Sequence, residues 1–132
     1  MAKPLRRLAL VGAILSMAWL FPRAQMPFID TANSGGSALE FNSTLQRALS
    51  TIKNVDTVVG GHTPTAVTWN DFRTYTEFYK TFTASAQEAM TRGTTVEAFI
   101  KSYSIPASFP GFMADPVRVK ANAEALWRES GK

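Results

Sequence analysis

The feature that most restricts the fold of this chain is a long amphipathic pattern over residues 68–93. Thr68 and Asp71 stand three residues apart at its start, the spacing of a capping box that satisfies the free N–H groups of a helix. Gly93 follows Arg92 at its end, where helices commonly stop in a left-handed glycine. Apolar residues between these points recur at intervals of three and four and predict one buried helix face. They are Phe72, Tyr75, Phe78, Tyr79, Phe82, Ala86 and Ala89. Aromatic residues at this spacing indicate core packing, in preference to an apolar substrate groove.

Two shorter helices are predicted after Gly93. Thr94 and Glu97 repeat the capping spacing, and the proline-rich stretch over residues 104–112 ends the helix that they begin. Asp115 and Pro116 then supply an N-cap and a first-turn proline for a last helix. The apolar positions of these two helices are Val96, Phe99, Ile100, Tyr103, Val119, Ala123, Leu126 and Trp127.

The part before the long helix predicts one helix and one strand. Leu45, Ala48, Leu49 and Ile52 repeat at helix spacing, which predicts a helix that begins at residue 42 or 43 and ends at residue 53. The β-branched run over residues 55–59 then predicts a strand that ends at two glycines. The predicted fold class is therefore α/β, with few strands followed by a mainly helical C-terminal portion.

Length and composition limit the function classes. A chain of 132 residues suffices for one modest domain, and the absence of cysteine excludes disulfides and thiolate metal sites. The net charge of +4 is concentrated near the N-terminus, and no stripe of basic and aromatic residues follows it. We therefore expect no nucleic-acid partner.

The N-terminal segment over residues 1–25 differs in character from residues 26–132. Lys3, Arg6 and Arg7 precede an uncharged apolar run over residues 8–21, the pattern of a secretory signal peptide. The run is shorter than the roughly 20 residues of a typical membrane-spanning helix. The alternatives are a retained anchor that contacts the membrane through residues 8–21, or a buried segment of the fold. A signal peptide predicts a periplasmic or secreted protein, and the other two predict a membrane-anchored or cytoplasmic one.

His62 is the only histidine, and it directly follows the strand and Gly60-Gly61. An imidazole at such a position can bind a metal ion or transfer protons near neutral pH. A zinc site normally needs three or four protein ligands, so Asp30 and Asp56, the nearest carboxylates in sequence, would have to help complete it. Asp56 is out of phase with the valines and is expected to face solvent or cap a turn. The residues alone therefore favour a structural histidine over a ligand.

Several segments together resemble one protein family. In order, they are LFPRAQMPFID, GGS, STLQRALSTIKNVDTVVGGHTP, TWNDFRTYTEFYKTF and AMTRGTTVEAF. In this order and spacing they look like the C-terminal half of a metallo-β-lactamase-fold, metal-dependent hydrolase, over roughly residues 20–127. The resemblance implies part of an αββα sandwich, zinc as the cofactor of the family, and His62 as the position of the final zinc-binding histidine.

The chain also departs from the family pattern. The first metal motif of the family, His-x-His-x-Asp-His, is impossible in a chain with one histidine, and Ala18-Trp19 stand where the family has Gly-Asp with its bridging aspartate. Zinc hydrolases activate water through the bound metal, and one remaining ligand does not hold zinc stably. The resemblance therefore implies a truncated member without catalytic residues and inactive by itself.

Three hypotheses follow about what the chain does and with what it associates. The first is the inactive hydrolase remnant, whose uncovered sheet would invite association with another copy. The second is the complementing half of a split zinc hydrolase, with a separately encoded N-terminal half as partner. The third is an exported or anchored binding protein that uses the remaining fold as an interaction surface.

Overall fold

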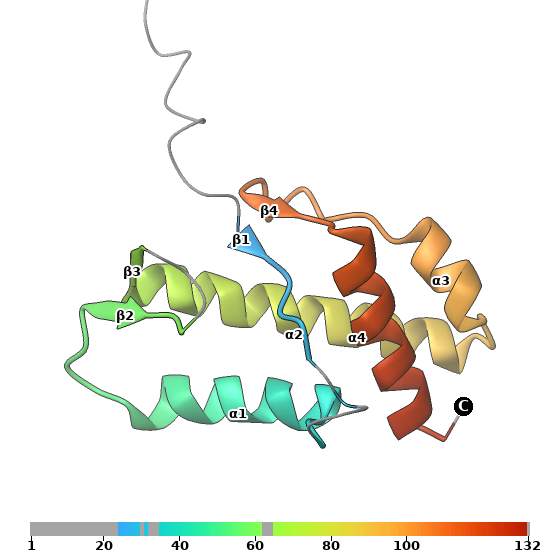
Figure 1. Cartoon of the computed structure of the whole chain (residues 1–132), viewed down its shortest axis with the longest axis horizontal. Coiled ribbons are helices and arrows are strands. Elements are labelled where there is room, and N and C mark those ends of the chain that lie inside the picture. The colour runs from blue at the N-terminus through green and yellow to red at the C-terminus, as the bar shows by residue number, and fades with distance from the viewer. Residues whose placement is uncertain (1–23, 30, 32–34, 62–64, 132) are drawn as a thin grey trace, which may run out of the picture.

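A computed structural model describes residues 24–29, 31, 35–61 and 65–131 of the chain. Over these ranges the fold is mixed α/β and mostly helical, as the sequence predicts at this level (Figure 1). The elements are β1 (Ala24–Gln25), α1 (Ala38–Thr51), β2 (Thr57–Val59), β3 (Ala66–Thr68), α2 (Trp69–Thr91), α3 (Val96–Ser102), β4 (Phe112–Met113) and α4 (Pro116–Glu129).

The long helix α2 confirms the sequence prediction at both ends. The Thr68 hydroxyl accepts a hydrogen bond from the Asp71 backbone N–H at 3.1 Å, and the Asp71 carboxylate accepts one from the Thr68 N–H at 2.9 Å. At the other end, Arg92 is the C-cap, and Gly93 adopts a φ of 75°. A left-handed residue at this position satisfies the last carbonyl groups, and glycine adopts it without strain.

The two C-terminal helices begin at capped positions, one of them a residue later than predicted. The N-cap of α3 is Thr95, not Thr94, because the Thr95 hydroxyl accepts from the Ala98 N–H at 3.2 Å. In α4 the prediction is confirmed: the Asp115 carboxylate accepts from two backbone N–H groups, and Pro116 occupies the first turn.

The first helix is longer at its N-terminus than the apolar spacing predicts. It begins at Ala38 rather than at residue 42 or 43, and it ends at Thr51. Ser37 is its N-cap, with the hydroxyl accepting from the Glu40 N–H at 3.0 Å. Ser37 and Glu40 have the capping-box spacing, so the sequence did contain a signal for the earlier start.

The strands form two separate two-stranded ladders in the described ranges. β1 pairs with β4 in parallel, with Ala24 opposite Phe112. β2 pairs with β3 in antiparallel fashion, with Val58 opposite Val67. The predicted strand over residues 55–59 is thus shortened to three residues.

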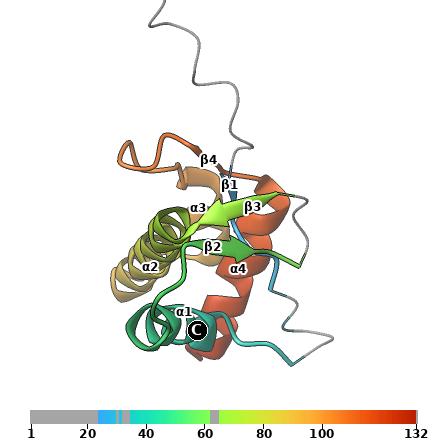
Figure 2. The ribbon, with the colours of Figure 1, turned by 90° about the vertical axis from the view of Figure 1, so that its left-hand side faces the viewer.

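The other helices pack around α2. α1 lies beside α2 and runs in the opposite direction, while α4 crosses the other half of α2 (Figures 1 and 2). The β2–β3 hairpin lies at the N-terminal end of α2, and α3 lies near its C-terminal end (Figure 1). The β2–β3 hairpin and α3 are thus separated by most of the length of α2.

The core is rich in aromatic side chains. Phe78, Tyr79 and Phe82 of α2 are fully buried, as the amphipathic pattern predicts. The Phe78 ring lies 4.1 Å from that of Phe112, and the Phe82 ring meets Tyr103 edge to face at 5.0 Å. Ring pairs of this kind add to the free energy gained from burial alone.

A buried polar network joins the chain segments around this core. The Tyr79 hydroxyl lies 3.2 Å from both the Ala38 carbonyl oxygen and the Asn122 side-chain oxygen. The Asn122 amide donates in turn to the Pro27 carbonyl at 2.7 Å and to the Arg118 carbonyl at 2.8 Å. Because buried polar groups are costly without partners, this network fixes how the segment after β1 and the start of α1 sit on α4.

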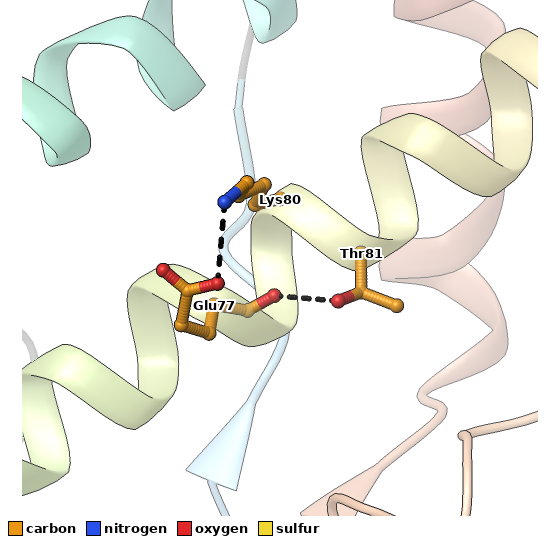
Figure 3. A network of polar contacts seen from close by, with 3 residues as sticks. All are labelled: Glu77, Lys80 and Thr81. Atoms are coloured by element: carbon orange, nitrogen blue, oxygen red, sulfur yellow. Dashed lines mark hydrogen bonds and ion pairs between the residues drawn. The ribbon is translucent and has the colours of Figure 1, made fainter.

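The outer face of α2 is polar. Glu77 and Lys80 form an ion pair at 3.5 Å, and the Thr81 hydroxyl donates to the Glu77 carbonyl at 2.8 Å (Figure 3). About half of the Glu77 and Lys80 side chains is exposed, so this pair contributes little to stability. Among the described residues, no helix has the length and apolarity that crossing a membrane requires.

Candidate functional site

The turn between β2 and β3 is the place where the sequence predicts a metal ligand. β2 leads into Gly60 and Gly61, and β3 begins at Ala66. His62 itself lies in residues 62–64, outside the described residues. The assignment of His62 as a metal ligand therefore stays a prediction.

Two described aspartates, Asp56 and Asp71, lie close to this turn in sequence. Asp56 is exposed and directly precedes β2, where its backbone carbonyl accepts from the Trp69 N–H at 2.9 Å. Its exposure agrees with the sequence prediction. Asp71 belongs to the capping box, and hydrogen bonds from the Thr68 side chain and backbone hold the pKa of Asp71 below its usual value.

These carboxylates do not supply a zinc ligand set. In residues 24–29, 31, 35–61 and 65–131, no group of three or more histidine, cysteine, aspartate or glutamate side chains could hold a metal ion. Asp30 and Trp19, two further positions that enter the sequence argument, lie outside these ranges. The described side chains by themselves therefore do not form a zinc site. Zinc binding stays a prediction for experiment.

The β2–β3 ladder that flanks the turn is poorly covered. None of its six residues is buried, and the Val59 side chain is 77% exposed. The Trp69 N–H donates to the Asp56 carbonyl, so these two residues form a hydrogen-bonded pair next to the ladder. Hydrogen-bonded and non-hydrogen-bonded pairs alternate in an antiparallel ladder, so the N–H and C=O groups of Thr57 and Val59 point away from β3. No backbone hydrogen bond between described residues reaches this outer edge of β2.

One long-range structural contact was missed by sequence reasoning. The Glu129 carboxylate, near the end of α4, accepts from the Ser37 hydroxyl at 2.7 Å and from the Ala38 and Leu39 N–H groups at 2.9 and 3.1 Å. The Ala38 and Leu39 N–H groups have no partner within the helix, and a negative charge is favoured at this end of α1. The partners are about 90 residues apart in sequence, so no local pattern could have revealed the contact.

Comparison with protein families, with curated proteins and with solved structures gave no match for this chain.

Proposed function

We propose that this chain is the C-terminal half of a metallo-β-lactamase-fold hydrolase that has no hydrolytic activity by itself. The observation that carries the proposal is the uncovered β2–β3 ladder next to Gly60-Gly61. Two-stranded ladders of this kind are at best marginally stable in water and normally belong to a larger sheet. A half-domain that has lost its other half would expose such a ladder.

The order of the described elements also supports this proposal. A short strand leads to the Gly-Gly pair, a second strand follows, and a capped aromatic helix starts directly after it. This order accommodates the segments on which the family resemblance rests. In this proposal His62 is the one remaining position of the metal site, and the other ligands are missing from the chain.

Zinc titration of the purified full chain, with elemental analysis, tests the proposal. We expect no stoichiometric zinc, weak binding that His62→Ala leaves unchanged, and no hydrolysis of ester or lactam substrates above the buffer rate. Tight 1:1 zinc binding that is lost in His62→Ala, together with zinc-dependent hydrolysis, would overturn the claim of inactivity.

The free edge of β2 favours a second candidate function, the complementing half of a split zinc hydrolase. In that case a separately encoded chain with a His-x-His-x-Asp-His motif supplies the missing ligands and pairs with this edge. Co-expression of the two chains should give zinc-dependent co-purification, and Val59→Lys on the edge should abolish it. Co-purification that does not depend on zinc or on Val59 would contradict this arrangement.

A further inference from the structure

A groove lies at the end of α2 that is remote from the hairpin. It has a volume of about 660 Å³ and is lined by residues of α2, α3, α4 and the turn between α2 and α3. Met90, Val96 and Trp127 give it an apolar lining. Trp127 is only 6% exposed, and its ring packs 5.2 Å from that of Phe99. The floor of the groove is thus held in place by the core.

Three charged side chains line the groove, and two of them have opposite charges beside them. Glu124 forms an ion pair with Lys120. Arg128 hydrogen-bonds to the Thr31 hydroxyl and lies close enough to Glu129 to lower the pKa of that carboxylate.

Glu97 is the exception among these charges. It is exposed in the first turn of α3, and it makes no ion pair with any residue of the described ranges. The groove therefore presents an apolar surface next to a carboxylate that forms no ion pair within the described residues, with Lys101 one helical turn away on α3.

We propose that this groove binds a small apolar ligand that carries a single cationic group, of the aryl- or alkylammonium class. The volume lies within the roughly 300–1,000 Å³ of small-molecule sites, and an apolar lining with few polar groups is typical of them. The apolar body of the ligand contacts Met90, Val96 and Trp127, and its ammonium group pairs with the Glu97 carboxylate.

This site is independent of the proposed hydrolase function. α2 has 23 residues, and at about 1.5 Å per residue its two ends are roughly 33 Å apart. A failure of the zinc experiments therefore does not affect the groove, and a failure at the groove does not affect the hairpin.

The test is an NMR titration of the full chain with three probes of similar size and different charge. These are 2-phenylethylammonium, 2-phenylethanol and 3-phenylpropanoate. We expect shifts at the Gly93 and Thr94 amides and the Trp127 indole, and binding about two- to fivefold tighter for the ammonium probe than for the alcohol, the range for an exposed charge pair. The carboxylate probe should bind most weakly.

Glu97→Gln is the decisive variant, because it keeps the shape of the side chain and removes its charge. It should abolish the preference for the ammonium probe over the alcohol while the alcohol still binds. Glu88→Gln, which removes another exposed carboxylate from outside the groove lining, is the matched control and should keep the preference. The proposal is overturned if no probe shifts the groove signals, if all three bind equally, or if Glu97→Gln retains the preference.

Discussion

At the scale of single residues, Glu129 shows how one carboxylate can fix the position of a whole helix. Its oxygens accept three hydrogen bonds from the start of α1, and bonds from a charged acceptor are stronger than those between neutral groups. Burial alone would raise the pKa of Glu129, but the bonds from Ala38, Ser37 and Leu39 and the charge of Arg128 lower it below the usual value of 4.5. The contact therefore favours the ionised form.

Glu129→Gln should lower the free energy of unfolding at pH 7 by about 1 kcal/mol or more, since the amide keeps one acceptor oxygen but loses the charge and replaces the other oxygen with an NH2 donor. A lowered pKa in the folded state stabilises the protein above the unfolded value of 4.5, and this contribution is lost as the pH falls through the folded-state pKa. Urea unfolding at pH 7 and at pH 3 measures both effects. The difference between wild type and variant should shrink at pH 3, and an equal difference at the two pH values would contradict the assignment.

At the scale of elements, α2 owes its boundaries to local chemistry and its stability to packing. Threonine is a mediocre helix former, yet α2 contains several threonines inside the helix. The hydroxyls of Thr76, Thr81 and Thr83 each donate to the carbonyl four residues earlier, so these side chains remain paired even where they are buried. Tertiary burial of the aromatic face then outweighs their low propensity.

Thr68→Ala should destabilise the chain by about 1 kcal/mol, because it removes the hydroxyl half of the capping box at the start of α2. Thr74→Ala is the matched control: Thr74 is an exposed threonine inside the same helix, and its hydroxyl bonds only to the Asn70 carbonyl. It should be neutral or slightly stabilising, since alanine is the better helix former. Urea unfolding followed by circular dichroism at 222 nm compares the two variants, and equal losses would argue against a special role of the cap.

At the scale of the whole molecule, the regions at the two ends of α2 differ in how well they are buried. The C-terminal helices share an aromatic core with the middle of α2, whereas the hairpin at the other end has no buried residue. Neither β2 nor β3 contains a charged residue or a proline, the usual protection of an exposed strand edge. We expect self-association of the isolated chain to involve this edge.

Val59→Lys should therefore reduce concentration-dependent association and change the free energy of unfolding by no more than about 0.5 kcal/mol, as for other exposed positions. Val117→Lys is the control, because Val117 is a similarly exposed valine, at 66%, that belongs to α4 and not to a strand. Light scattering over a concentration series measures the association. If both substitutions reduce it equally, exposed apolar area in general causes it, and the strand edge has no special part.

The sequence alone determined the helix ends and the buried helix face wherever these depend only on residues close together in the chain. The caps at Thr68 and Asp115, the stop at Gly93 and the buried face of α2 depend on neighbours within a few residues, so their spacing predicted them. The predicted start of α1 was wrong because the apolar repeat begins only at Leu45, whereas the helix begins a full turn or more earlier, at the Ser37 cap.

Only the tertiary structure decided which distant groups meet. Glu129 and Ser37, or Asn122 and Pro27, are brought together by the packing of α4 against α1 and the segment after β1. The groove likewise exists because α2, α3 and α4 converge around Met90, Val96 and Trp127. Such contacts join residues from separate parts of the chain, and their energies depend on burial and distance. Neither quantity is encoded in the spacing of residues along a single element.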